Sequence, residues 1–308
     1  MGTSPQVLVL RALKLGDLLV AVPAIHAVGR GLPHHRLILA VPSWLAPIVE
    51  LIDGVDRLHP TPGLNQPLGF PPGAIDTAIN MHGNGPQSLH IIEALEPRVL
   101  ITHDAHGGPR WVDGVLERER WVGLVEAFGM PGDPNQVELA LPSVPAPHPN
   151  AAVVHVGAFY GSRQWPVERF GAVCGELHTR GYDVVVTGSA SERPRAARVA
   201  THAGLSPAAV LAGRLDLAQF AAQIAAARVV ISADTGAAHL ASAYATPSVV
   251  IFGPAPPSVW GPPPGPHVVL TDCSARRGDP FADKPDPALL AVKPADVIAA
   301  LADLPGQL

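Results

Sequence analysis

The feature that most constrains the fold of this 308-residue chain is one pattern that occurs twice, on either side of a proline-rich stretch. Residues 141–150 read LPSVPAPHPN, and four prolines in ten residues exclude a helix or a central strand there. On both sides, short apolar runs alternate with helical stretches, which is typical of βαβ units and parallel sheets. We expect an α/β chain of two Rossmann-like domains, residues 1–145 and 150–308, facing each other across a cleft. The last helix is expected to be able to pack back on the first domain.

The expected elements follow from apolar runs and from glycine and proline breaks. The predicted strands are Val7–Arg11, Arg36–Val41, Asp76–Met81, Val99–Thr102, Ala152–Val156, Val184–Thr187, Val229–Ser232 and Ser248–Phe252. The predicted helices are Leu18–Arg30, Val167–Arg180, Ser191–Gly204, Leu217–Ala227, Ala237–Tyr244 and Pro294–Leu304. In open parallel sheets, ligands bind beyond the carboxyl ends of the strands. The loops after the strands are therefore where chemistry is expected.

Composition narrows the class of protein. With 47% hydrophobic and 15% charged residues the chain can bury a sizeable core, and its net charge of −5 disfavours nucleic acid as a partner. Cys174 and Cys273 form no CxxC pair, so we expect two reduced thiols. Arg11, Lys14 and Asp17 interrupt the apolar N-terminal stretch, which argues against a signal peptide. We expect a cytoplasmic protein with at most peripheral membrane contact.

The loop after the first strand carries Leu15-Gly16-Asp17. Gly16 permits a tight turn and the close approach of another molecule. Asp17 stands where a helix begins, and two roles fit it. Its carboxylate can cap free backbone amides at the helix start, or it can act as a general base on a hydroxyl group.

A second candidate site is the segment Ile231–His239, ISADTGAAH, which reads as strand, small-residue turn and helix. Free backbone amides and the positive helix end make such a turn a phosphate site. Asp234 fits either a helix cap or a contact to sugar hydroxyls. His239 fits either a packed residue or a phosphate contact.

Two further loops of the second half carry side chains that could bind a nucleotide diphosphate. Gly157–Pro166, GAFYGSRQWP, includes Ser162 and Arg163, and a guanidinium gives bidentate contacts to a diphosphate. A solvated surface arginine is the alternative. Glu192, after Thr187-Gly188-Ser189, fits either ribose binding or a favourable charge in the first turn of a helix.

Missing motifs exclude other chemistries. No strand is followed by GxGxxG, and the chain holds no GxxxxGK[ST] and no GxSxG, so dinucleotide cofactors, a P-loop and a hydrolase elbow are disfavoured. No Asp-x-Asp pair is present to hold a divalent ion at a diphosphate. We expect no metal and no cofactor, with helix amides and Arg163 stabilising the charge of a leaving group.

Taken together, these loops resemble glycosyltransferase family 9, the lipopolysaccharide heptosyltransferase family. The N-terminal VLVLRALKLGDLLVAVPAIHAV is similar to the family's opening strand and Gly-Asp turn. The segment from Leu211 to Pro254 carries DTG, the following histidine, Thr-Pro and Phe-Gly-Pro in the family's order. DTAINMHGN resembles the strand of the acceptor side, and ALLAVKPADVIAAL resembles the family's C-terminal end.

The resemblance implies a GT-B fold and an inverting, metal-independent transfer from a nucleotide-diphosphate sugar such as ADP-heptose. Asp17 matches the catalytic base. The residues implied to bind the donor are Gly16, Ser162, Arg163, Glu192, Leu215, Asp234, Thr235, Gly236 and His239. The acceptor-side candidates are His82, Asn84 and Arg120.

Two departures concern the substrates. Arg163 stands where many members have lysine, and Leu116 replaces the histidine of the HxxER element to which Arg120 belongs. The acceptor hydroxyl therefore stays open between a glycan, a glycolipid and a small-molecule natural product. Two alternative functions also stay open: a non-hydrolysing nucleotide-sugar epimerase of the same fold, and a catalytically idle protein that binds a sugar nucleotide.

Overall fold

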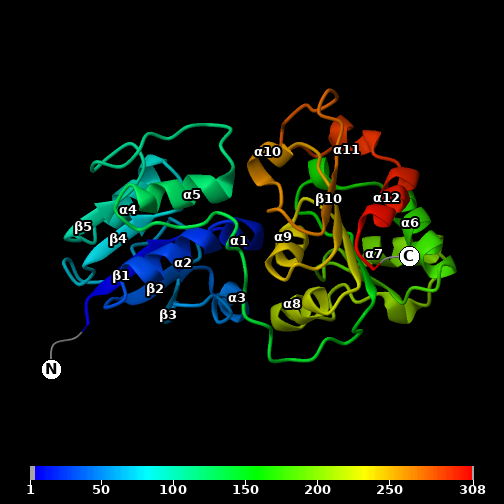
Figure 1. Ribbon diagram of the computed structural model, residues 1–308, viewed down its shortest axis with the longest axis horizontal. Helices are drawn as coiled ribbons and strands as arrows, with labels where there is room; N and C mark the ends of the chain where they lie inside the picture. Colours follow the sequence, from blue (N-terminus) through cyan, green and yellow to red (C-terminus); the bar gives the residue numbers. More distant parts are fainter. Residues whose placement is uncertain (1–3, 307–308) are drawn as a thin grey trace. The chain divides into compact units, whose positions relative to one another are not determined.

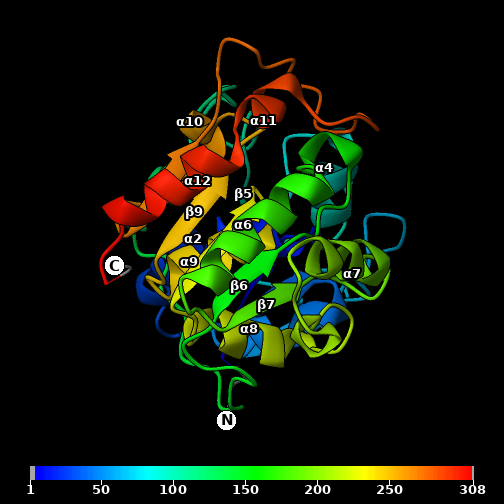
Figure 2. The same cartoon turned by 90° about the vertical axis from the view of Figure 1, so that its right-hand side faces the viewer.

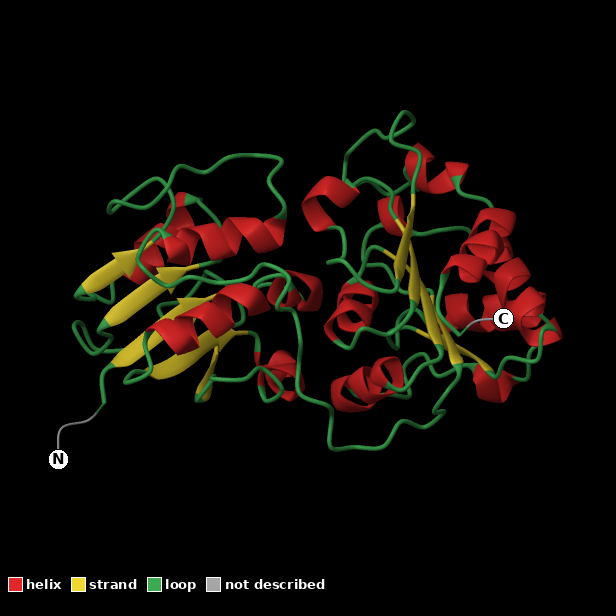
Figure 3. Cartoon of the chain, viewed as in Figure 1, coloured by secondary structure: helices red, strands yellow, loops and turns green. Residues whose placement is uncertain are grey.

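The computed structural model describes residues 4–306, which fall into two compact units that divide between Ala140 and Leu141. Each unit holds one five-stranded sheet, and every strand pairing within both sheets is parallel (Figures 1 and 3). The prediction of two parallel-sheet α/β domains is confirmed. Residues 141–150, between the two sheets in sequence, form neither helix nor strand.

The first sheet has the strand order β3-β2-β1-β4-β5. Its strands are β1 (Gln6–Leu10), β2 (Arg36–Val41), β3 (Arg57–Pro60), β4 (Thr77–Asn80) and β5 (Val99–Ile101). The central strands are buried along almost their whole length, which explains why they read as continuous apolar runs. The chain order reverses between β1 and β4, so the loops after these two strands flank the switch point of the sheet.

The helices of the first unit cover this sheet. They are α1 (Leu15–Leu19), α2 (Val22–Gly31), α3 (Ala46–Val49), α4 (Pro86–Glu93) and α5 (Glu117–Glu126), with a 3-10 turn at Ser43–Leu45. Helix α2 packs against α5. On α4, Ile92 joins an apolar cluster with Leu8 and Leu10 of β1.

The second sheet has the order β10-β9-β8-β6-β7. Its strands are β6 (Ala152–His155), β7 (Val184–Thr187), β8 (Val229–Ala233), β9 (Ser248–Ile251) and β10 (His267–Leu270). Strand β6 lies between β7 and β8, so the switch point falls between β6 and β8. The loops after β6 and β8 therefore leave the sheet side by side.

Helices lie on both faces of the second sheet, with α8 and α9 on one face and α6, α7 and α12 on the other (Figures 1 and 2). The α-helices are α6 (Val167–Thr179), α7 (Arg193–His202), α8 (Leu217–Ala225), α9 (Gly236–Ala243), α10 (Pro257–Trp260), α11 (Pro287–Ala291) and α12 (Pro294–Ala300). The 3-10 turns are Gly161–Arg163, Pro207–Ala209 and Leu301–Asp303. Helix α12 packs on α6 and β10 of its own unit.

The structure corrects the expected start of the first helix. Gly16 and Asp17 lie inside the first turn of α1, not in a tight turn before it. The expected long helix is broken at Val20–Ala21, because Pro23 has no N–H for the carbonyl of Leu19 and its ring would clash with that carbonyl. None of the helices within residues 4–306 combines the length and the apolar character that a crossing of a bilayer would need.

Candidate functional site

The predicted functional residues lie at the carboxyl ends of the strands, in two groups, one in each unit. In the first unit they follow β1 and β4, the strands at the switch point. In the second unit they follow β6, β7 and β8. Because ligands of open α/β sheets bind at such points, the topology independently singles out these loops.

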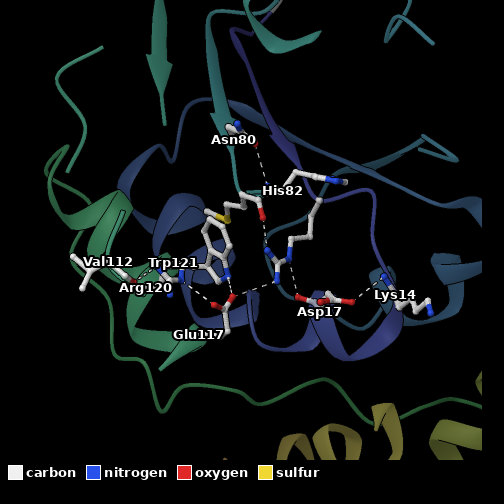
Figure 4. Close-up of polar contacts among 10 residues, drawn as sticks. Lys14, Asp17, Asn80, His82, Val112, Glu117, Arg120 and Trp121 are labelled. Carbon is white, nitrogen blue, oxygen red and sulfur yellow. Dashed lines mark hydrogen bonds and ion pairs between the residues drawn. The ribbon is translucent and has the colours of Figure 1, made fainter. Parts of the chain in front are cut away.

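Asp17 is the third residue of α1, and its side chain is half-buried. Its Oδ2 accepts the backbone N–H of Lys14 at 3.2 Å, so the carboxylate does help to cap the helix (Figure 4). A half-buried carboxylate at the start of a helix suits both of the roles that the sequence left open.

Arg11, directly after β1, holds this part of the first unit together. The residue is 1% exposed, and its Nε donates to the carbonyl of Asp17 at 2.8 Å. Its Nη1 donates to the carbonyl of Met81 after β4, and Nη2 lies 4.0 Å from Glu117 Oε2. Burial lowers the pKa of Arg11, while the nearby carboxylates of Asp17 and Glu117 oppose that shift.

Glu117 is the acidic partner of this network and is itself buried. Its Oε1 accepts from Arg120 Nε at 2.8 Å, and its Oε2 accepts from Trp121 Nε1 at 3.0 Å (Figure 4). The Arg11 guanidinium stacks over the Trp121 ring, 4.5 Å from its centroid. We call Arg11, Asp17, Glu117, Arg120 and Trp121 the Arg11 network.

The structure does not support Arg120 as an acceptor-binding residue. The residue is 6% exposed, and its guanidinium donates to Glu117 and to the carbonyl of Val112 and lies 3.8 Å from the centroid of the Trp111 ring. A side chain whose fork is committed in this way has little left for a phosphate. The HxxER resemblance pointed to an arginine in the right element but did not show that its partners are internal.

The loop after β4 carries the other two acceptor-side candidates. His82 is half-buried, its backbone N–H donates to Asn80 Oδ1 at 3.1 Å, and its Nδ1 has no hydrogen-bond partner among the described residues. Burial, aided by the charge of Arg11, lowers the pKa of His82 to about 4. Asn84 is exposed at the tip of the loop. The lowered pKa keeps the His82 imidazole uncharged at neutral pH, although the carboxylate charge of Asp17 opposes this shift.

In the second unit, Arg163, Asp234, Thr235 and His239 meet at the end of β8, and we call these four residues the β8 cluster. Arg163 Nη1 lies 3.3 Å from Asp234 Oδ2, and His239 Nε2 lies 3.5 Å from Asp234 Oδ1. The Asp234 side chain is 4% exposed, whereas that of Arg163 is 27% exposed. The structure therefore brings together loops after β6 and β8, as the sequence predicted.

Several atoms of the β8 cluster are buried without a hydrogen-bond partner. Among the described residues these include Arg163 Nε and Thr235 Oγ1, whereas Asp234 Oδ2 accepts no hydrogen bond but forms the ion pair with Arg163. Gly236 begins α9 with Thr235 as its N-cap, and helix geometry leaves the first N–H groups without intrahelical acceptors. Buried polar atoms without partners are costly, so this cluster has the composition of a site completed by an anionic, hydroxylated ligand.

Glu192 stands at the start of a helix, in line with one of the two roles expected for it. It is the N-cap of α7, and its Oε1 and Oε2 accept the backbone N–H groups of Ala158 and Ser189 at 2.8 and 2.7 Å. Burial alone would raise the pKa of Glu192, but these hydrogen bonds and the nearby His155 outweigh burial and lower it. The carboxylate joins the loops after β6 and β7, so the proposed ribose contact would have to use lone pairs beyond these two bonds.

Gly157 explains how closely these groups approach. A Cβ atom there would lie 2.6 Å from both Glu192 Oε2 and His155 Nε2, so any larger residue would displace these two side chains. Burial lowers the pKa of His155 to about 4. The sequence analysis did not single out His155, although its place at the end of a buried strand was a signal, as it was for Arg11.

Ser162 and Leu215, both predicted to bind the donor substrate, differ in their exposure. Ser162 is fully buried, and its hydroxyl donates to the carbonyl of Pro280 at 2.8 Å, so the structure places it in support of the segment 280–286 and not at a ligand. Leu215 is partly exposed in the turn before α8, where its side chain remains available for apolar contact. Gly16 is half-buried in α1.

The chain matches the model of glycosyltransferase family 9 (heptosyltransferase) over residues 128–276. Lipopolysaccharide heptosyltransferase 1 of Pseudomonas aeruginosa is 41% identical over 106 residues, which are 34% of this chain and 29% of that protein. This alignment therefore spans less than a third of that relative's length. The Escherichia coli (strain K12) enzyme of the same name is 23% identical over 291 residues, which cover 83% of this chain and 90% of that protein.

The solved structure of E. coli ADP-heptose LPS heptosyltransferase II has the same fold, with a TM-score of 0.74 and 18% identity over 96% of this chain and 97% of that chain. Both of its parallel-sheet domains thus have counterparts here, in the GT-B architecture that the resemblance implied. The fold and the matching sequences agree with the motifs at the ends of β1 and β8. They show that the chain is similar to the heptosyltransferases of glycosyltransferase family 9.

Proposed function

We propose that the chain is an inverting glycosyltransferase that moves heptose from ADP-heptose to an acceptor hydroxyl. The observation that carries this proposal is the β8 cluster, where a buried carboxylate, a guanidinium and a helix N-terminus converge with polar atoms left unpartnered. Such a set matches a sugar diphosphate, which offers anionic oxygens and hydroxyl groups together. ADP-heptose is named in the description of the related E. coli structure, which supports this choice of donor.

The proposed reaction places Asp17 on the acceptor. Its carboxylate takes the proton of the acceptor hydroxyl as that oxygen attacks the anomeric carbon from the face opposite the diphosphate. The new carbon–oxygen bond forms while the bond from carbon to the phosphate oxygen breaks, and ADP keeps the electron pair. The configuration inverts. The proposal requires Asp17 and the β8 cluster to act on one donor–acceptor pair, with the first unit holding the acceptor and the second the donor.

Two groups stabilise the negative charge that develops on the departing ADP. Arg163 offers a guanidinium whose Nε is unpartnered, and the N–H groups at the start of α9 add the positive end of the helix. We therefore propose that transfer is metal-independent. Residues 4–306 contain no group of three or more His, Cys, Asp and Glu side chains placed to hold a metal ion.

The loop after β4 supplies the proposed contacts to the acceptor. His82 and Asn84 lie on the loop after β4 and are proposed to contact the acceptor, whereas Arg120 is committed within the protein. A neutral His82 ring can accept or donate a hydrogen bond to a sugar hydroxyl. The acceptor is proposed to be a glycan, glycolipid or hydroxylated small molecule, used in the cytoplasm with at most peripheral membrane contact.

The first test is calorimetric binding of ADP, GDP and UDP to the purified protein with a chelator present throughout. We expect selective ADP binding, followed by transfer from ADP-heptose with release of ADP. Preference for another nucleotide would overturn the donor. ADP binding without transfer to any of a panel of acceptors would contradict the proposed enzyme and favour an idle binding protein.

The second test is Asp17→Asn, with Asp53→Asn, an exposed carboxylate of the same unit, as the matched control. Loss of a general base is expected to lower kcat by about 100-fold or more while the Kd for ADP stays the same. The control variant should keep both values. Normal transfer by the Asp17→Asn protein would remove Asp17 from the mechanism.

A further inference from the structure

Arg11 has contacts that no part of the proposed reaction uses, and they join three separate segments. Its side chain reaches the carbonyl of Asp17 in α1, the carbonyl of Met81 after β4, and the carboxylate of Glu117 in α5. The residue is 1% exposed and lies at the switch point of the first sheet. Burying a guanidinium is costly unless its donors are satisfied, and here each terminal or internal nitrogen has a partner.

The contact with Asp17 replaces a missing helix bond. In a continuous helix the carbonyl of Asp17 would accept the N–H of Ala21, but at the break between α1 and α2 that N–H bonds Leu18 instead, at 3.0 Å. Arg11 Nε supplies the donor at 2.8 Å. Helix α1 has five residues and is too short to be stable by its own hydrogen bonds, so this external donor fixes where its third residue stands.

Through its contact with Met81, Arg11 also fixes the backbone of the loop after β4, which carries the proposed acceptor residues. Met81 precedes His82, and Arg11 donates to its carbonyl through Nη1. One rigid guanidinium therefore binds the backbone beside both the proposed base and the proposed acceptor loop. A lysine at this position has one flexible ammonium in place of a planar fork, so it would hold the two carbonyls less exactly.

Glu117, Arg120 and Trp121 support Arg11 from the other side. Glu117 Oε2 faces Arg11 and accepts from Trp121 Nε1, while Arg120 Nε fixes Oε1 at 2.8 Å. The ring of Trp121 lies under the Arg11 guanidinium, 4.5 Å from it. Arg120 thus holds the carboxylate of Glu117 that faces Arg11, and Figure 4 shows the bond between Arg120 and Glu117.

We propose that Arg11 is a positioning residue for Asp17, held by Glu117, and that it sets the geometry between the base and the acceptor loop. The inference rests on the proposed function. It predicts that loss of Arg11 lowers kcat because Asp17 is no longer aligned with the acceptor hydroxyl at the loop after β4. Displacement of a reacting group by about 1 Å can cost about 100-fold in rate, so a similar loss is expected for Arg11→Met.

The test is a double-mutant cycle with Arg11→Met, Asp17→Asn and the combined variant, assayed for transfer from ADP-heptose. Arg11→Met should lower kcat by about 100-fold, with the donor KM within about twofold of the original value. In the Asp17→Asn background the same change should cost less than about threefold, because the base is already absent. Arg11→Lys should restore part of the rate. Losses that multiply in the combined variant would overturn the proposal, as would full activity of Arg11→Met.

The matched control is Arg118→Met. Arg118 is also a buried arginine, in the same helix as Glu117, but it bonds to the carbonyl of Pro134 and to Asn135. This variant should lower the unfolding temperature without lowering kcat. A fall in kcat as large as that of Arg11→Met would show that any buried arginine of the unit matters equally, and would contradict a specific role.

Hydrogen exchange separates this inference from the proposed function. In Arg11→Met, or in Glu117→Gln if that protein does not fold, amides of α1 and of residues 81–83 should exchange faster, while those of α9 should not. This result is expected even if the original protein transfers no sugar, which would refute the proposed function alone. Unchanged exchange in α1 together with normal transfer would refute the role of Arg11.

Discussion

At the scale of single residues, two arginines differ in how many of their donors the protein itself uses. Arg120 is buried and its fork is occupied by Glu117 and Val112. Arg163 pairs with Asp234, yet its Nε has no partner among the described residues and its side chain is 27% exposed. An arginine with spare donors beside a helix N-terminus is prepared for an anion, whereas one with none is structural.

This difference predicts the effect of replacing Arg163. Arg163→Met should weaken ADP binding by about 10- to 100-fold, because charged hydrogen bonds contribute roughly 1.5–3 kcal/mol. The Kd of Arg163→Lys for ADP should fall between those of the original protein and of Arg163→Met, since lysine keeps the charge but loses the planar fork. Calorimetry measures all three values.

The matched control for Arg163 is Arg180→Met, which breaks an exposed pair with Glu176 on α6. Exposed pairs of this kind contribute little, so both stability and ADP binding should stay close to those of the original protein. If Arg163→Met binds ADP as tightly as this control does, Arg163 has no role at the diphosphate.

At the scale of elements, the loop after β6 is supported by the segment 280–286. Ser162 donates its hydroxyl to Pro280, its N–H bonds Ala282 at 2.8 Å, and its carbonyl accepts from Asp286 at 3.0 Å. A Cβ atom on Gly161 would lie 1.8 Å from the carbonyl oxygen of Asp283. These contacts hold the residue next to Arg163 in place.

Ser162→Ala is therefore expected to act on stability more than on ligand binding. Loss of one buried hydrogen bond should lower the free energy of unfolding by about 1 kcal/mol, because the carbonyl of Pro280 loses its donor. The Kd for ADP should change by less than about twofold. Denaturant unfolding and calorimetry measure the two effects. A tenfold weaker Kd would instead restore Ser162 to the donor site, as the sequence alone suggested.

The elements that could be predicted are those whose own residues decide them. Strands such as β2 and β7 are apolar runs buried along most of their length, and their expected bounds match the structure. Strand β3, read as RLHP, is partly exposed and ends in proline, so no apolar run marks it. Strand β10 was missed because its four residues are only half-buried at the edge of the sheet.

In the candidate site too, only the features that depend on local sequence could be predicted. The DTG segment joins a buried strand to a helix, so its place beside a helix N-terminus follows from local sequence. The partners of Arg120 and Ser162 come from distant segments, such as Pro280, which lies 118 residues from Ser162. No local pattern records such contacts, and the same holds for Arg11 and Glu117.

At the scale of the whole molecule, buried histidines link stability to pH. Burial lowers the pKa of His82, His155 and His267 to about 4, from an ordinary value of 6.5. His82 belongs to the first unit, and the other two belong to the second. Below pH 6.5 these histidines bind protons in the unfolded chain but remain unprotonated in the folded chain until the pH approaches 4, so acid favours unfolding.

Because the pKa values of these histidines are lowered on folding, their effect on stability is confined to the pH range between the folded and unfolded pKa values. The contribution of these histidines is fully present above pH 6.5 and is lost as the pH falls from 6.5 toward 4, after which it changes no further. Each can contribute up to about 1.4 kcal/mol per pH unit in that window, and less where the ring is partly exposed. Asp76, whose pKa is lowered chiefly by Arg98, loses its contribution at more acid pH, below its ordinary value of 3.8.

Thermal unfolding between pH 7.5 and 4.5 tests this linkage, and His267→Gln isolates one term of it. His267 Nδ1 lies 2.9 Å from Ser248 Oγ, a contact that an amide can retain without taking up a proton. The unfolding temperature of the original protein should fall as the pH drops, and the fall should be smaller in the His267→Gln variant. His178→Gln, an exposed position on α6, is the control and should leave the slope unchanged. A His267→Gln protein with the same slope as the control would show that His267 titrates alike in the folded and unfolded states.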